Sequence, residues 1–380
     1  MVVLGAVVIG ILFVALTAYW LHRRLVVATG LSGWWAKAAD AVLVVGSLLG
    51  ITALLVGRTL DPSWSRPLGY AGYTWWAFVY YLSLGAAVIG LLALLVRLVR
   101  GKSDGPRRWV AVLTGVMVVA AAATTAYGLR EAARPTVTED TATVDKLPPE
   151  FDGLRVAFIT DLHVGPAISP TFTTRVVEQV NAAKPDLVLV GGDLADGTVR
   201  LVKKGVEPLR YLRAPLGVYS VSGNHEYYSD DGGAWLDVWQ ILGLRPLRNE
   251  RVELRRGGAV IDLAGVYDRT APAPYHPDYR KALDGRDPSR ALIFLAHEPK
   301  QAEGVQGRGV GLQFSGHTHG GQIWPFRYAV RLQQPIVSGF GKVGDVPVFV
   351  SRGTGAWGPP VRVGAPPQIA MITLRRSAVE

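Results

Sequence analysis

Four long apolar runs occupy the first third of the chain. They cover residues 2–20, 39–57, 73–96 and 109–127, and each is long enough to cross a bilayer as a helix. None has the polar face that a helix of a soluble bundle shows, so we predict four transmembrane helices. A signal peptide is the alternative for the first run, but the basic segment and shorter apolar core typical of such peptides are absent from this sequence.

Basic residues in the loops between these runs predict the orientation of the helices. The basic residues of the first and third loops are Arg23, Arg24, Lys37, Arg97, Arg100, Lys102, Arg107 and Arg108. The second loop carries only Arg58 and Arg66, offset by Asp61. Because basic short loops stay in the cytoplasm, the first and third loops are predicted inside and both termini outside. We therefore expect a multi-pass protein of the cell membrane whose chain after residue 127 is extracytoplasmic.

The four apolar runs contain almost no ionisable residue at membrane depth, apart from Asp40 at the edge of the second run. Transporters and proton relays usually carry such residues, so we interpret the runs as an anchor. Tryptophans near the ends of the runs fit the aromatic belts of a membrane interface. These tryptophans are Trp34, Trp35, Trp75, Trp76 and Trp109.

A different pattern begins near residue 136. Residues 136–144 are rich in threonine and valine and predict an edge strand, and short apolar runs then alternate with helical segments, which is typical of an α/β domain. Strands are predicted at 154–160, 187–190, 218–221, 260–266, 292–296, 310–314, 346–350 and 369–374, and helices at 170–183, 203–212 and 234–242. Ser169 as N-cap and Pro170 at the first helical position mark the first of these helices. We expect a transmembrane region over residues 1–133 and a separate domain over 134–380.

Composition narrows the chemistry of this domain. The chain has no cysteine, which excludes disulfides, thiolate metal sites and a cysteine nucleophile. The net charge of +10 suits contact with membrane lipids at an anionic surface or with a phosphate-bearing substrate. No basic run with interleaved aromatic residues predicts a nucleic-acid groove, so a nucleic-acid partner is not expected.

Histidines are concentrated in short polar motifs that follow the predicted strands. Of seven histidines, two lie in the Gly-His-Thr-His-Gly-Gly turn and three more follow other strands. The polar residues at the strand ends are Asp161, His163, Asp193, Asn224, His225, His297, His317 and His319. Open α/β sheets build their sites at this edge, and oxygen and nitrogen ligands without sulfur suit Mn, Fe or Zn. Eight such groups exceed the needs of one tetrahedral ion and suit a pair that shares a carboxylate and activates a bridging water.

In this order the motifs resemble those of the calcineurin-like metallophosphoesterase superfamily, whose pattern runs D-x-H, G-D, G-N-H-D/E, H and G-H-x-H. They stand here as Asp161 with His163, Asp193 after Gly192, residues 223–226, His297 and residues 316–319. The resemblance covers residues 136–376, and the segments 147–154 and 359–364 look like its membrane-associated bacterial branch. It implies two packed, mixed β-sheets with helices on both outer faces, and it says nothing about the anchor.

The resemblance also implies a role for each residue of the motifs. Asp161, His163 and His319 would bind the first of two divalent metal ions. Asn224, His297 and His317 would bind the second, and Asp193 would bridge both. His225 would not bind metal but would stabilise the phosphate or protonate the leaving oxygen, next to Asn224 in the catalytic site.

The implied activity is hydrolysis of a phosphomonoester or phosphodiester by a metal-activated hydroxide. The anchor favours a lipid-linked or other envelope substrate over a soluble nucleotide. Two alternatives stay open: a transporter or membrane protein with a regulatory phosphate-binding domain, and a binding module without activity. A missing ligand position would favour the second alternative, and none is missing from the pattern.

Four further residues are weaker candidates for a role in the site. Asp196 and Asp268 could orient histidines from behind, although an ordinary turn position explains them as well. Trp357 could form a pocket wall and Arg362 could contact phosphate, although packing and surface exposure are common fates of these residue types.

Overall fold

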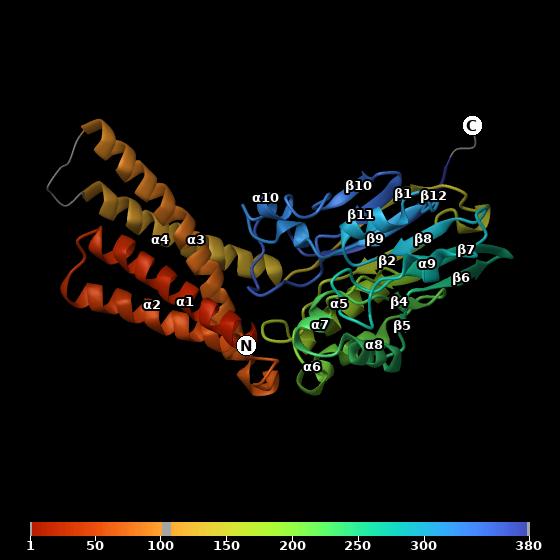
Figure 1. Ribbon diagram of the computed structural model, residues 1–380, viewed down its shortest axis with the longest axis horizontal. Helices are drawn as coiled ribbons and strands as arrows, with labels where there is room; N and C mark the ends of the chain where they lie inside the picture. The colour runs from red at the N-terminus through yellow and green to blue at the C-terminus, as the bar shows by residue number, and fades with distance from the viewer. Residues whose placement is uncertain (1, 101–107, 378–380) are drawn as a thin grey trace.

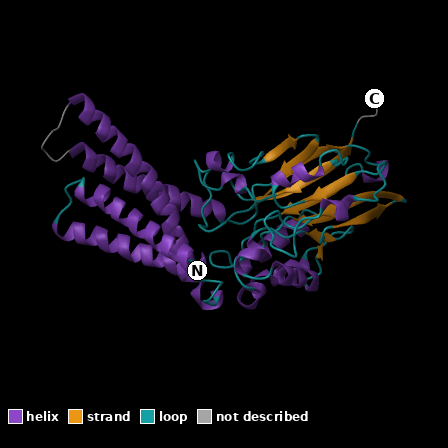
Figure 2. Cartoon of the chain, in the orientation of Figure 1, coloured by secondary structure: helices purple, strands orange, loops and turns teal. Residues whose placement is uncertain are grey.

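The computed structural model describes residues 2–100 and 108–377. A bundle of long helices lies on one side of the molecule and a domain built on β-sheets lies on the other (Figures 1 and 2). The basic charges predicted for residues 101–107 of the third loop lie outside the described residues.

Four helices of the bundle are long and apolar enough to cross a membrane, which supports a membrane location. They are α1 (Val2–His22), α2 (Gly33–Ala53), α3 (Pro62–Arg100) and α4 (Arg108–Ala132). A π-helical turn, η1 (Arg23–Val27), extends the first helix. Helix α3 begins eleven residues before the predicted run. The first part of the helix is more polar, so the apolar pattern does not include it.

Glycines of α2 receive the tryptophans of α3. A Cβ atom at Gly46 would lie 2.3 Å from the ring of Trp75, and one at Gly50 would lie 2.8 Å from the ring of Trp76. The indole Nε1 of Trp76 donates to the carbonyl oxygen of Gly50 at 3.1 Å. Small residues that let helices approach closely are typical of helix–helix contacts within membranes. Because α3 begins at Pro62, both tryptophans lie inside the helix and not at its first turn.

The domain contains two six-stranded sheets, as the α/β prediction required. The first has the order β1-β12-β2-β3-β4-β5 and the second the order β10-β11-β9-β8-β7-β6. Both are mixed, with β12 antiparallel to β2 and β6 antiparallel to β7. The strands of the first sheet are β1 (Thr136–Val144), β2 (Arg155–Ile159), β3 (Leu187–Val190), β4 (Val218–Ser220), β5 (Arg245–Pro246) and β12 (Gln368–Arg376). The strands of the second are β6 (Glu250–Arg256), β7 (Ala259–Gly265), β8 (Leu292–Leu295), β9 (Leu312–Ser315), β10 (Gly339–Val343) and β11 (Val346–Val350).

The main core lies between the facing sheets, where the aromatic rings of Phe158, Phe314 and Phe349 meet edge to face. The outer face of the first sheet packs against helices that include Trp235 and Trp239. The helical segments of the domain are α5 (Pro170–Ala182), α6 (Val199–Val206), α7 (His225–Ser229), α8 (Gly232–Ile241), α9 (Tyr279–Leu283), α10 (Arg327–Val330), η2 (Pro149–Phe151), η3 (Glu207–Tyr211), η4 (Pro299–Val305) and η5 (His319–Gly321). A third apolar cluster lies between the second sheet and its own outer helices. The predicted architecture of two packed sheets flanked by helices is therefore confirmed.

Backbone hydrogen bonds join the bundle to the domain at two places. The loop after α2 accepts a bond at the Gly57 carbonyl from the amide of Thr198, 2.9 Å away. Near the end of α4, the Gly128 carbonyl accepts from the amide of Arg362, also at 2.9 Å. The guanidinium Nε of Arg66 in α3 donates to the carbonyl of Gly165 at 3.2 Å. The domain therefore packs on the end of the bundle.

The joint at Gly128 predicts a selective sensitivity to side-chain volume. A Cβ atom at Gly128 would lie 2.4 Å from Val361, whereas one at Gly115 of the same helix meets nothing within 4 Å. We expect Gly128→Leu to lower the free energy of unfolding by about 1–3 kcal/mol through overpacking, while Gly115→Leu leaves it unchanged or raises it. Thermal unfolding of the two full-length variants in one detergent measures the difference. Equal melting temperatures would contradict the tight joint.

Candidate metal centre

All eight polar residues predicted at strand ends come together at one edge of the two sheets. Asp161 and His163 follow β2, Asp193 follows β3, and Asn224 and His225 follow β4. In the second sheet His297 follows β8, and the two-histidine turn follows β9. The site is thus shared by the two sheets, and neither sheet alone holds a complete set of ligands.

Left-handed backbone conformations aim these side chains at one point. The residues of the site with φ between 51° and 67° are Asp161, His163, Asp193, His317 and His319. Such conformations are uncommon outside glycine and collect at functional sites. These conformations lie in the loops that follow β2, β3 and β9, where the candidate ligands are found.

Two glycines of the motifs are required by close approach. A Cβ atom at Gly223 would lie 2.1 Å from a carboxylate oxygen of Asp193, and one at Gly316 would lie 2.3 Å from a carboxylate oxygen of Asp161. Any side chain at these positions would displace a candidate ligand. This explains why glycine precedes the Asn-His and His-Thr-His segments.

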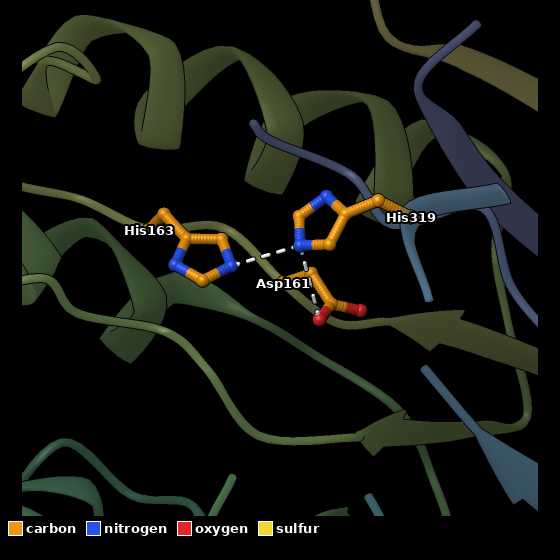
Figure 3. Close-up of side chains that lie close together, drawn as sticks. All are labelled: Asp161, His163 and His319. Carbon is orange, nitrogen blue, oxygen red and sulfur yellow. Dashed lines mark hydrogen bonds and ion pairs between the residues drawn. The ribbon is translucent and has the colours of Figure 1, made fainter. Parts of the chain in front are cut away.

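The first group of candidate ligands consists of Asp161, His163 and His319 (Figure 3). The two Nε2 atoms of His163 and His319 are 3.0 Å apart. Nε2 of His319 also lies 3.4 Å from Oδ1 of Asp161. All three residues are buried.

The second group consists of Asn224, His297 and His317, again around one point. Oδ1 of Asn224 lies 3.1 Å from Nε2 of His297 and 2.9 Å from Nδ1 of His317. Oδ2 of Asp193 lies 3.1 Å from Nε2 of His297 and 3.8 Å from Nε2 of His163. One oxygen of Asp193 therefore faces both groups.

These spacings fit the donor set of a metal centre. Ligand atoms about 2.1 Å from one ion lie about 3.0 Å apart in octahedral and about 3.4 Å apart in tetrahedral geometry. The distances within the two groups fall between 2.9 and 3.4 Å. Nitrogen and oxygen atoms converge without sulfur, which is the donor set that Mn, Fe and Zn accept.

A series of hydrogen bonds determines which ring nitrogens of His319 and His163 carry protons. Arg362 can only donate, so its contact of 3.1 Å with Nδ1 of His319 leaves the neutral ring protonated at Nε2. That proton points to Nε2 of His163, whose Nδ1 donates in turn to Asp196 at 2.8 Å. Binding of a cation at Nε2 of His319 would require this nitrogen to be free of its proton.

Asp196 supports two histidines at once. Its Oδ1 accepts from Nδ1 of His163 and from Nδ1 of His225, the latter at 2.6 Å. The candidate orienting role of Asp196 is therefore present in the structure. Asp268 instead bonds to the amide and hydroxyl of Thr270, which is the ordinary turn arrangement.

Neighbouring charges at the site stabilise the carboxylate of Asp193. Burial raises the pKa of Asp193, but the charges of His297, His225 and His163 outweigh it and hold the pKa well below its usual range. Burial by itself lowers the pKa of His225, but the carboxylates of Asp196 and Asp193 raise it to about 9. The centre therefore holds Asp193 as a buried carboxylate that needs positive neighbours.

The position of His225 does not by itself assign this residue to one of the two ligand groups. It forms a third cluster with His163 and Asp193, yet its Nδ1 is engaged by Asp196. Its backbone amide donates to Oδ1 of Asp193 at 2.8 Å. His225 thus belongs to the site but to neither of the two ligand groups.

Comparison with known proteins identifies the family. The sequence profile of the calcineurin-like phosphoesterases matches residues 154–321. YkuE, a metallophosphoesterase of Bacillus subtilis, is 31% identical over 63% of this chain and 85% of its own length. This chain belongs to the calcineurin-like metallophosphoesterase family.

Two further relatives match this chain over a smaller share of their own length. A transmembrane protein with a metallophosphoesterase domain from Bos taurus is 36% identical over 72% of this chain and 65% of its own length. A metallophosphoesterase of Helicobacter pylori is 41% identical over 64% of each chain. The chain therefore spans slightly less than two thirds of the length of these relatives.

Two buried charged residues support the candidate site through hydrogen bonds that the sequence did not indicate. The carboxylate of Glu226 accepts from the amides of Asp193, Leu194 and Gly223, so it ties two ligand loops together. Arg362 is fully buried and donates to several backbone carbonyls. The candidate contact of Arg362 with phosphate is therefore absent, because the side chain is buried.

A cavity of about 350 Å³ opens over the candidate metal ligands. Its floor is formed by Asp193, Asn224, His317 and His319, and α10 lies on one side. Trp357, 47% exposed, lies on the wall, as the pocket-wall interpretation predicted. A phosphate group can therefore reach the candidate ligands from solvent.

The position of Asp193 between the two groups predicts the effect of removing it. We expect Asp193→Ala to retain the fold but to bind fewer than two metal ions per chain, because both groups lose a shared oxygen. Metal content by plasma mass spectrometry and far-UV circular dichroism test this. Asp237→Ala, which removes an exposed carboxylate paired with Arg248, is the matched control. Full metal content in Asp193→Ala would contradict the prediction that Asp193 serves both ligand groups.

Proposed function

We propose that the protein is a membrane-anchored phosphoesterase with two divalent metal ions, Mn, Fe or Zn, that hydrolyses a phosphomonoester or phosphodiester. Residues 1–133 would be the anchor and residues 134–380 the catalytic domain. The anchor favours a lipid-linked or envelope substrate. The observation that carries the proposal is the spacing of two ligand groups around the Asp193 carboxylate.

Seven residues would hold the ions. Asp161, His163 and His319 belong to the first site, and Asn224, His297 and His317 to the second, with Asp193 common to both. When bound, the ions would lower the pKa of water for attack on phosphorus and neutralise charge on the phosphoryl oxygens.

His225 would act on the substrate itself, supported by Asn224 beside it. Asp196 holds Nδ1 of His225, which leaves Nε2 free to donate to an oxygen of the substrate. A residue so placed suits protonation of the leaving oxygen. Asp196 would act as a positioning residue, because it fixes the ring orientation of both His163 and His225.

A hydrolysis screen tests the proposed activity. The full chain would be purified, stripped of metal and reloaded with Mn²⁺, Fe²⁺ or Zn²⁺ in turn, and phosphate release from p-nitrophenyl phosphate would be measured. We expect activity that requires added metal and is lost in Asp193→Ala. Absence of metal-dependent hydrolysis with all three ions would refute the proposed reaction.

The role of His225 predicts a dependence on the leaving group. We expect His225→Ala to keep both metals while activity falls by roughly 10²–10⁴-fold with alkyl phosphates. The loss should be smaller with p-nitrophenyl phosphate, because a stable phenolate needs little protonation. Equal losses for both substrates would show that His225 acts on the phosphate oxygens instead. Loss of metal in parallel with activity would make His225 a ligand.

We also propose that the catalytic domain faces away from the cytoplasm, on the basis of the loop charges. Alkaline phosphatase fused after Arg134 should then be active, because this reporter folds only when exported. The same reporter fused within residues 101–107 should be inactive, with comparable amounts of protein in both cases. The opposite pattern would reverse the proposed orientation.

A further inference from the structure

A second cavity lies beside His225, between the membrane helices and the catalytic domain. Its volume is about 410 Å³, within the range of small-molecule sites. The bundle contributes Leu54, Arg58, Tyr73 and Trp76 to its wall, and the domain contributes His225 and Trp357 among others. We call this cavity the vestibule.

The vestibule lies at the level where the apolar bundle ends. Helix α2 ends at Ala53, and its last turns pack on α3 so closely that a Cβ atom at Gly72 would lie 2.1 Å from the carbonyl of Leu49. Helix α3 has 39 residues, about 58 Å of helix, whereas the hydrocarbon core is about 30 Å thick. Its first turns therefore extend beyond the bilayer toward the domain, and Arg66 there contacts Gly165.

Residue types in the vestibule match a membrane interface. Tyr73 and Trp76 are the aromatic types that collect at this level, and Leu54 is 49% exposed next to them. Within the described part of the chain, the Arg58 guanidinium makes no hydrogen bond or ion pair. A cation in this position attracts an anionic headgroup.

The vestibule borders the cavity over the candidate metal ligands. His225, Tyr228 and Trp357 line both this cavity and the one over the candidate ligands. The ring of His225 lies 5.0 Å from that of Tyr228 and 6.3 Å from that of Trp357. A leaving oxygen that takes a proton from His225 must lie within hydrogen-bond reach of it, so the leaving alcohol lies where the vestibule begins.

We infer that the vestibule binds the lipid alcohol of a membrane-embedded phosphate ester while its phosphate lies at the metal centre. This inference rests on the proposed function. Water oxygen bonds to phosphorus, the bond from phosphorus to the alcohol oxygen breaks, and that oxygen keeps the electron pair and takes the proton of His225. A proton from the attacking water restores His225, and the products are the lipid alcohol and the phosphate.

The test compares two esters with the same intrinsic reactivity, hexadecyl phosphate and ethyl phosphate. The full chain would be loaded with metal in phospholipid nanodiscs, and the ratio of kcat/KM for the two esters measured. Each buried methylene contributes roughly fourfold, so the wild-type ratio should exceed about 100. Because hexadecyl phosphate concentrates in any bilayer, the change of this ratio between variants is decisive.

Leu54→Gln is the vestibule variant, and Leu55→Gln is its matched control. The two leucines are adjacent and similarly exposed, at 49% and 46%, but only Leu54 lines the vestibule. We expect Leu54→Gln to lower the ratio at least about tenfold and Leu55→Gln to leave it within about twofold. Trp357→Ala with Trp324→Ala as control repeats the comparison if Leu54→Gln does not fold. Equal ratios in variant and control would overturn the inference.

A binding measurement separates the vestibule from the reaction. Hexadecyl phosphonate carrying a diazirine on its chain would be cross-linked to the protein in nanodiscs, and the labelled residues mapped by mass spectrometry. Labels at Leu54, Arg58, Tyr73, Trp76 or Trp357 support the inference, and labels confined to residues outside the vestibule overturn it. If no ester is hydrolysed, including p-nitrophenyl phosphate, the proposed function fails, while the cross-links still decide the vestibule.

Discussion

The carboxylate of Asp193 faces two groups of imidazole, amide and carboxylate ligands at once, and the geometry of the site depends on this. To bring one oxygen near both His163 and His297, the loop after β3 must approach the loop after β4 without an intervening side chain. Gly223 provides that approach, and the buried carboxylate of Glu226 holds both loops by their amides. The two sheets must also meet at one edge, because each supplies only part of the ligand set.

The buried polar network behind the ligands limits how the site can respond to a cation. Arg362, His319, His163 and Asp196 form a continuous series of hydrogen bonds, so the ring orientations are already fixed before an ion binds. Preorganisation of this kind reduces the reorganisation needed at a catalytic centre. The backbone amide of Arg362 also donates to the carbonyl of Gly128 in α4, so a residue next to a candidate ligand contacts the helical bundle.

The helical bundle contacts the domain close to the candidate site. The loop after α2 bonds to Thr198, two residues from Asp196, and Arg66 of α3 reaches the loop that follows His163. The end of the bundle therefore lies against the loops that carry candidate ligands. This arrangement suits a substrate that approaches along the membrane, since one wall of the path is made by membrane helices.

Sequence patterns determined the four apolar helices, the alternation of strands and helices, and the set of polar residues at the strand ends, because hydrophobic periodicity and local caps act over a few residues. Ser169 caps α5 as predicted. Helix α6 was instead placed four residues too late, because the amide of Val199 at its start is bonded by Asp230, thirty-one residues away. Strand β6 was missed, because its alternation is carried by only Val252 and Leu254. The tertiary structure alone decided four features: the left-handed turns, the burial of Arg362, the two hydrogen bonds that Asp196 accepts from histidines, and the vestibule. Each depends on contacts between segments that no local pattern in the chain specifies.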